Sequence, residues 1–112
     1  MHCRHLSPIS SQCNAHNGDA RGIIVFSKDN DSSKSLATDI LDEVKSIAPT
    51  ESWRSEVKGS GNYGETTRIQ SDSILIEYAF HDNPDDAKWI MDNITELGKL
   101  TAQGIVNNLL QR

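Results

Sequence analysis

Glu77 is the side chain whose type and setting point most directly to chemistry in this sequence. It lies inside the apolar run at residues 74–80 (ILIEYAF), and an ionised carboxylate is costly to remove from water unless something pairs with it. Because side chains alternate between the two faces of a strand, Glu77 shares its face with Leu75 and Ala79. The other face carries Ile74, Ile76, Tyr78 and Phe80. A lone acid near the end of a buried strand suits a general acid or base at the mouth of a sheet.

Two simpler interpretations of Glu77 stay open at this point. The residue could lie on an edge strand and point to solvent, or it could pair with an arginine such as Arg68. Either arrangement would satisfy the carboxylate without any catalytic role.

The residues around Glu77 also carry a resemblance. The stretch 74–87 (ILIEYAFHDNPDDA) resembles the C-terminal signature of the zinc-dependent N-acetylmuramoyl-L-alanine amidases of bacterial cell walls and phage endolysins. In that family an apolar strand ends in a catalytic glutamate, followed by a Gly/Ala-Phe step and by an Asn-Pro that begins a helix. Upstream, residues 9–15 (ISSQCNA) and 18–26 (GDARGIIVF) resemble the family's Ser-Ile-His-x-Asn-Ala strand and the turn into Gly-x-Glu-Val-Phe.

The sequence departs from the family at the metal ligands. Aligning Asn14 and Ala15 on the family's Asn-Ala puts Gln12 where the zinc-binding histidine belongs, and a glutamine amide is a weak ligand for zinc. The family's other two ligands belong to an N-terminal portion that has no counterpart here. We therefore expect residues 9–112 to be the C-terminal part of an amidase-like catalytic domain, preceded by an unrelated or disordered tail at 1–8.

The resemblance implies a mechanism and a partner. In intact relatives a zinc-bound water attacks the amide that joins N-acetylmuramic acid to L-alanine in peptidoglycan, and the glutamate aligned with Glu77 takes the proton of that water. With Gln12 in place of the histidine, we expect this chain to bind Zn²⁺ poorly and to hydrolyse slowly or not at all. Two alternatives remain: a non-catalytic wall-binding or regulatory remnant, and an unrelated small α/β interaction domain.

The amino-acid composition limits the classes of partner and the location that we expect. Acidic residues outnumber basic ones by 16 to 11 in the 112-residue chain, which argues against nucleic acid. The sequence contains no run of 18 apolar residues, so no membrane span is expected. The N-terminus lacks the apolar core of a signal peptide. The resemblance implies action outside the cell or in the cell wall. Without a signal peptide, the expectation for this chain is the cytoplasm until it is released, and phage lysins and sporulation enzymes reach the wall by such other routes.

The N-terminal cysteines and histidines form no zinc motif. Structural zinc sites pair two ligands at short spacing with two more further along, and no second compact pair accompanies the first. We prefer free thiols on a frayed terminus, although a disulfide between the two cysteines is an alternative. The residues concerned are His2, Cys3, His5, Cys13 and His16.

The pattern predicts an α/β fold with a mixed sheet of a few strands flanked by helices, a truncated amidase-type three-layer domain. Strands are expected at 9–13, 23–26 and 74–80, and 50–72 reads as an irregular connection in which Trp53 is buried. A helix should run from an N-cap at 29–33 to Ile47 and end at Pro49. The missing strands would leave an open sheet edge, which predicts self-association.

Two further helices are expected after residue 82. The first begins at Asn83-Pro84 and ends near Met91, because Asn is a good N-cap and Pro fits the first helical position. The second begins at Asn93 with a capping box to Glu96. Its buried face is predicted to carry Ile94, Leu97, Thr101, Ile105 and Leu109.

Overall fold

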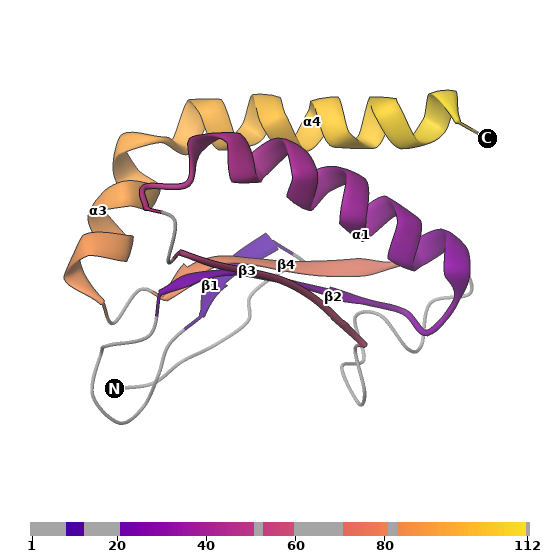
Figure 1. Cartoon of the computed structure of the whole chain (residues 1–112), viewed down its shortest axis with the longest axis horizontal. Coiled ribbons are helices and arrows are strands. Elements are labelled where there is room, and N and C mark those ends of the chain that lie inside the picture. Colours follow the sequence, from indigo (N-terminus) through magenta and orange to yellow (C-terminus); the bar gives the residue numbers. More distant parts are fainter. Residues whose placement is uncertain (1–8, 13–20, 51–52, 60–70, 81–82, 112) are drawn as a thin grey trace.

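A computed structural model describes residues 9–12, 21–50, 53–59, 71–80 and 83–111, and for 9–12 only the backbone. Four strands form one mixed sheet in the order β1-β4-β2-β3. Their bounds are Ile9–Gln12 (β1), Gly22–Ser27 (β2), Arg54–Gly59 (β3) and Ile74–Phe80 (β4). β1 is parallel to β4, β4 is antiparallel to β2, and β2 is parallel to β3. Figure 1 shows this sheet below the helices.

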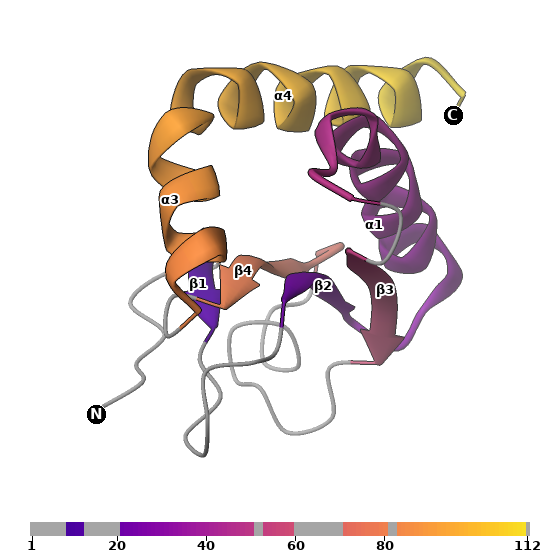
Figure 2. The same ribbon diagram turned by 60° about the vertical axis from the view of Figure 1, so that its left-hand side comes forward.

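The helices lie over one face of the sheet. They are α1 (Asp31–Val44), which continues as the 3₁₀ turn η1 (Lys45–Ile47), α3 (Pro84–Asp92) and α4 (Ile94–Leu110). Figure 2 shows all three α-helices on the same side, with α3 leading from the sheet up to α4. The described elements thus form a sheet layer and a helix layer, and the expected α/β fold with a mixed sheet is confirmed. No described helix has the length and apolarity needed to cross a membrane.

The core lies between the sheet and α1. The apolar stripe of α1 packs on the helix-facing side of β2 and β4, and both tryptophans close the core at the η1 end. Its buried members include Ile23, Val25, Ala37, Ile40, Val44, Trp53, Ile76 and Trp89. The expected burial of Trp53 is confirmed, since that residue is 5% exposed.

The starts of α1 and α3 follow the sequence closely. The Asn30 side chain accepts a hydrogen bond from the Ser33 amide at 2.8 Å, and the Asn83 side chain accepts from the Asp85 and Asp86 amides at 3.0 and 3.2 Å. Pro84 occupies the first turn of α3, where its missing N–H is not needed. The predicted N-caps are therefore confirmed for both helices.

The predicted capping box of α4 is wrong. Asn93 precedes the helix, but it makes no side-chain cap there. Its side-chain amide instead donates to the Trp89 carbonyl at 2.8 Å. This hydrogen bond joins Asn93 to the end of α3, so the side chain is turned away from the start of α4.

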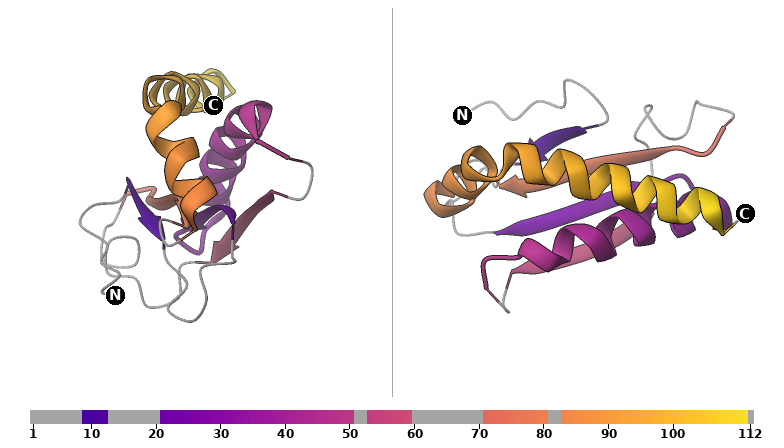
Figure 3. Two further views of the ribbon diagram at one scale, coloured as in Figure 1. Left: turned by 90° about the vertical axis from the view of Figure 1, so that its left-hand side faces the viewer. Right: turned by 90° about the horizontal axis from the view of Figure 1, so that it is seen from above.

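The buried face of α4 also differs from the prediction. Leu97 and Thr101 are buried as expected, whereas Ile94, Ile105 and Leu109 are exposed. Instead, the helix buries Gly104 and Asn108. α4 packs along α1, as the view from above in Figure 3 shows, and small or hydrogen-bonding residues let the two helices approach closely. An ideal Cβ on Gly104 would lie 2.5 Å from the Ile40 Cα.

β3 was not expected from the sequence, which indicated an irregular connection at 50–72. Arg54, Glu56 and Lys58 alternate with Ser55 and Val57, a polar composition that is typical of edge strands. Pairing with β2 along residues 54–59 holds this segment in the sheet. In the described part of the chain β1 and β3 form the two edges. Self-association through an edge stays a prediction.

Candidate active site

Glu77 lies on a central strand. β4 has β1 on one side and β2 on the other. Glu77 is level with Ser10 of β1 and lies opposite Ile24 of β2. The interpretation of Glu77 as an edge-strand residue is therefore excluded.

The Glu77 side chain belongs to the face of the sheet opposite the helices. Its neighbours Ile76 and Tyr78 face the helix layer: Ile76 is in the core, and the Tyr78 hydroxyl lies 2.7 Å from the Thr101 hydroxyl of α4. Alternation along the strand then places Glu77 on the other face. It is 4% exposed, so Glu77 is buried on that face of the sheet. Arg68 lies outside the described residues.

Gln12, on β1, pairs with a position further along β4 than Glu77. The register places Ser10 beside Glu77 and Gln12 beside Phe80, with an irregularity in β1 between the two. Gln12 is thus near the carboxyl end of β4, at the same end of the sheet as Glu77. Its side chain is outside the described part of the structure, so the alignment of Gln12 with the family's zinc-binding histidine stays a prediction.

Asp86 joins two strands at this end of the sheet by hydrogen bonds. This role was not predicted from the sequence. The Asp86 carboxylate accepts hydrogen bonds from the Gly22 amide at 2.8 Å, from the Phe80 amide at 3.2 Å and from Arg21 Nε at 2.7 Å. The Asp86 side chain is fully buried. One side chain therefore fixes the start of β2 and the end of β4, the strands that carry Ile24 and Glu77. The sequence offered only an acid in the first turn of a helix, which is equally well explained by the helix dipole.

Gly22 completes the junction. Its φ is +120°, and an ideal Cβ would lie 2.2 Å from the Arg54 carbonyl oxygen. Only glycine tolerates both the backbone conformation and the close approach of β3. This is one of the glycines in the stretch 18–26 that carried the resemblance.

The described residues do not fit a zinc site. No group of three or more His, Cys, Asp or Glu side chains comes together in the part of the chain that the structure describes. His2, Cys3, His5, Cys13 and His16 all lie outside that part. Glu77 has no metal-ligating side chain at its register position on β2, where Ile24 stands.

Comparison with known proteins relates this chain to a protein family. A family profile described as N-acetylmuramoyl-L-alanine amidase matches residues 8–107, which include β1, Gly22, Glu77 and Asp86. The chain belongs to the N-acetylmuramoyl-L-alanine amidase family. The expected resemblance is thus confirmed, and the hypothesis of an unrelated interaction domain is wrong. No curated protein matches the chain.

Solved structures share the fold. The CwlD amidase from Clostridioides difficile, in complex with the GerS lipoprotein, superposes with a TM-score of 0.73 at 25% identity over 93% of this chain and 54% of that chain. The catalytic domain of the CD27L endolysin targeting Clostridia difficile has a TM-score of 0.70 at 24% identity, with 88% of this chain and 53% of that chain covered.

A third structure agrees with these two. The N-acetylmuramoyl-L-alanine amidase from Clostridium difficile 630 has a TM-score of 0.62 at 26% identity, over 92% of this chain and 55% of that chain. The chain therefore spans about half the length of each of these three solved chains. Family membership is established for the part that is present, and the activity of the whole domain is a separate question.

Proposed function

We propose that this chain is the C-terminal part of a peptidoglycan amidase-type domain in which Glu77 is the general base. The substrate class is the amide between N-acetylmuramic acid and L-alanine. The observation that carries the proposal is the position of Glu77 on the central strand β4, on the face opposite the helices, within the matched family region. Peptidoglycan is the proposed partner, and the cell wall is the proposed site of action.

The chain's own residues supply positioning and proton transfer. Asp86 holds β2 and β4 together at the end of the sheet, and Gly22 lets β3 pack against the start of β2. These contacts fix the backbone that carries Glu77. A general base must sit within hydrogen-bond reach of the proton that it removes, so this rigidity serves the proposed role directly.

We further propose that hydrolysis by this chain is impaired. Gln12 stands where the family has a zinc ligand, and the described residues bring no three metal-binding side chains together. The second candidate function, binding of peptidoglycan without cleavage, is favoured by the same observation. In that case the fold is retained as a recognition surface, while Glu77 is a remnant of the catalytic site.

The test compares the parent chain with Glu77→Gln on purified peptidoglycan. The readouts are the release of free L-alanine amino groups and retention on the insoluble wall in a pull-down, with zinc content measured on both proteins. We expect Glu77→Gln to abolish whatever cleavage the parent shows and to leave wall binding unchanged, because the amide keeps the shape and removes the base. Glu96→Gln on the exposed side of α4 is the matched control.

The outcomes separate the two candidates. Wall binding without cleavage in either protein favours the recognition role. Equal cleavage by the parent and Glu77→Gln would remove Glu77 from the mechanism. Failure of the parent both to bind and to cleave would contradict both candidates for the chain by itself.

A further inference from the structure

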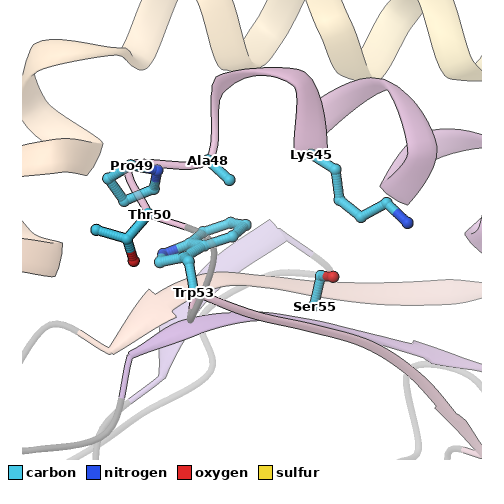
Figure 4. A pocket seen from close by; sticks show the side chains of 6 residues that line it. All are labelled: Lys45, Ala48, Pro49, Thr50, Trp53 and Ser55. Atoms are coloured by element: carbon cyan, nitrogen blue, oxygen red, sulfur yellow. The ribbon is translucent and has the colours of Figure 1, made fainter.

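A pocket opens at the junction of η1 and β3, on the helix side of the sheet. Its volume is about 480 Å³, within the range that holds small organic ligands. Glu77 belongs to the opposite face, so the pocket is separate from the candidate active site. The lining residues, shown in Figure 4, are Lys45, Ala48, Pro49, Thr50, Trp53 and Ser55.

The two tryptophans of the chain differ in whether the indole N–H has a hydrogen-bond acceptor among the described residues. Their rings pack with centroids 4.7 Å apart. Trp89 Nε1 donates to the Ile47 carbonyl at 3.1 Å. Trp53 is 5% exposed, yet its Nε1 is a buried donor for which the described residues provide no acceptor. A buried donor left unsatisfied is destabilising, and native structures contain few of them.

The described side chains that line the pocket carry one positive charge and two hydroxyl groups. The charge is the ammonium group of Lys45, and the hydroxyl groups, which can donate or accept a hydrogen bond, belong to Thr50 and Ser55; none of the described lining residues is a carboxylate. Lys45 Nζ lies 3.5 Å from Asp42 on the surface, and its side chain is 48% exposed. Exposed ion pairs of this kind are weak, so the Lys45 side chain can turn and bring its charge toward the pocket.

We propose that this pocket binds a small organic carboxylate. One oxygen of the ligand accepts the hydrogen bond from Trp53 Nε1, and Lys45 attracts the negative charge. Pro49, Ala48 and the indole contact the apolar body of the ligand. Figure 4 shows the indole nitrogen on the side of the ring toward Thr50. Thr50 is exposed, and its side chain must move aside for the ligand to reach this nitrogen.

Two sources offer this chemistry: a wall fragment that bears the lactyl carboxylate of N-acetylmuramic acid, and a free aromatic acid. The probes are therefore two matched pairs, each an acid and its neutral counterpart. N-acetylmuramic acid is compared with N-acetylglucosamine, and benzoate is compared with benzamide. The inference stands independently of amidase activity, because no probe contains the amide that amidases cleave.

The readout is the indole N–H signal of each tryptophan in ¹H–¹⁵N NMR spectra, assigned with Trp53→Phe. We expect the Trp53 signal to move downfield and saturate with at least one acid, with a dissociation constant of about 1 mM or lower. The neutral counterpart should leave it in place. The Trp89 signal is the internal reference, because that N–H already donates to the Ile47 carbonyl. The acid that binds identifies the source.

Variants at the rim of the pocket test how much the positive charge of Lys45 contributes to binding. Lys45→Met keeps the apolar stem and should weaken binding about three- to tenfold, because a partly exposed charge is screened by salt. Lys34→Met is the matched control, since Lys34 lies on α1, is 49% exposed and pairs with Asp29 at 3.0 Å, much as Lys45 of η1 is 48% exposed and pairs with Asp42. Asp42→Asn releases Lys45 and should bind as tightly as the parent or more tightly.

Two results would overturn the proposal. The first is a Trp53 signal that does not move with either acid at about 10 mM, ten times the expected dissociation constant. The second is an equal shift with an acid and its neutral counterpart, which would show that the pocket does not select for the carboxylate.

Discussion

The Asp86 carboxylate accepts a hydrogen bond from the Gly22 amide, 64 residues earlier in the sequence, at 2.8 Å. The same oxygen accepts from the Phe80 amide at 3.2 Å, and the other oxygen pairs with Arg21 at 2.7 Å. α3 is thereby tied to the start of β2 and to the end of β4. This contact connects the segments on which the family resemblance rests, namely the Gly22 turn and the strand that ends after Glu77.

Asp86→Ala should destabilise the fold by about 3 kcal/mol, because it leaves Arg21 and two backbone amides without their acceptor. Urea unfolding monitored by tryptophan fluorescence measures the change. Asp85→Ala is the control: its side chain is exposed in the same first turn, and its loss should cost about 0.3–1 kcal/mol through the helix dipole. Equal losses for the two variants would contradict the anchoring role of Asp86.

Gly104→Ala and Gly98→Ala should act in opposite directions, although both lie in α4. A Cβ at position 104 would lie 2.5 Å from the Ile40 Cα and 2.9 Å from the Asp39 carbonyl oxygen, whereas position 98 has nothing within 4 Å. Gly104→Ala should therefore cost about 1–3 kcal/mol by overpacking. Gly98→Ala should gain about 0.5–1 kcal/mol by helix propensity. Thermal unfolding of both variants tests this, and a stabilising Gly104→Ala would show that α4 does not pack closely on α1.

Tyr78 should make stability fall at high pH. Burial raises the pKa of Tyr78 above its ordinary 10.0, and the hydrogen bond with Thr101 only partly offsets this effect. The folded state therefore holds the phenolic proton more tightly than the unfolded state. The resulting stability is fully present below about pH 10 and is lost as the pH rises through the folded value.

Urea midpoints measured from pH 8 to pH 11 test this expectation (these limits bracket the ordinary tyrosine pKa of about 10). Tyr78→Phe should be less stable at neutral pH by about 1 kcal/mol, because the hydrogen bond is lost, but its midpoint should decline less above pH 10. Tyr63→Phe provides the comparison for the other tyrosine. A decline of the same steepness in Tyr78→Phe and in the parent would assign the alkaline loss to other groups.

Gln12→His should raise the affinity for zinc, because imidazole is a far better ligand than an amide. The gain should stop short of a tight site, since one histidine with water does not replace three protein ligands. Calorimetric zinc titration measures it. Ser10→His is the sharp comparison, because Ser10 is the β1 residue level with Glu77. If Gln12→His leaves zinc binding unchanged while Ser10→His improves it, the alignment of this strand with the family motif is wrong.

Local sequence determined the beginnings of the helices and the strand that carries Glu77. Asn30 and Asn83 cap α1 and α3 because a short polar side chain before an amphipathic segment satisfies free backbone amides wherever the chain folds. The alternation along residues 74–80 likewise fixed which face Glu77 takes once one face was buried. The motif around Glu77 combines a strand, an acid and a helix start at fixed spacing, and together with the upstream motif at residues 9–26 it identified the family.

The tertiary structure decided what depended on partners distant in sequence. β3 is polar and forms because β2 offers a complete row of backbone hydrogen-bonding groups. Asp86 and Asp85 are both acids in one helical turn, and only the approach of Gly22 and Phe80 buries the former. α4 rotates its apolar Ile105 and Leu109 outward, because close packing on α1 favours Gly104 and hydrogen-bonded Asn108. Sequence periodicity reports which residues share a face, but the shape of the neighbouring helix selects the face that is buried.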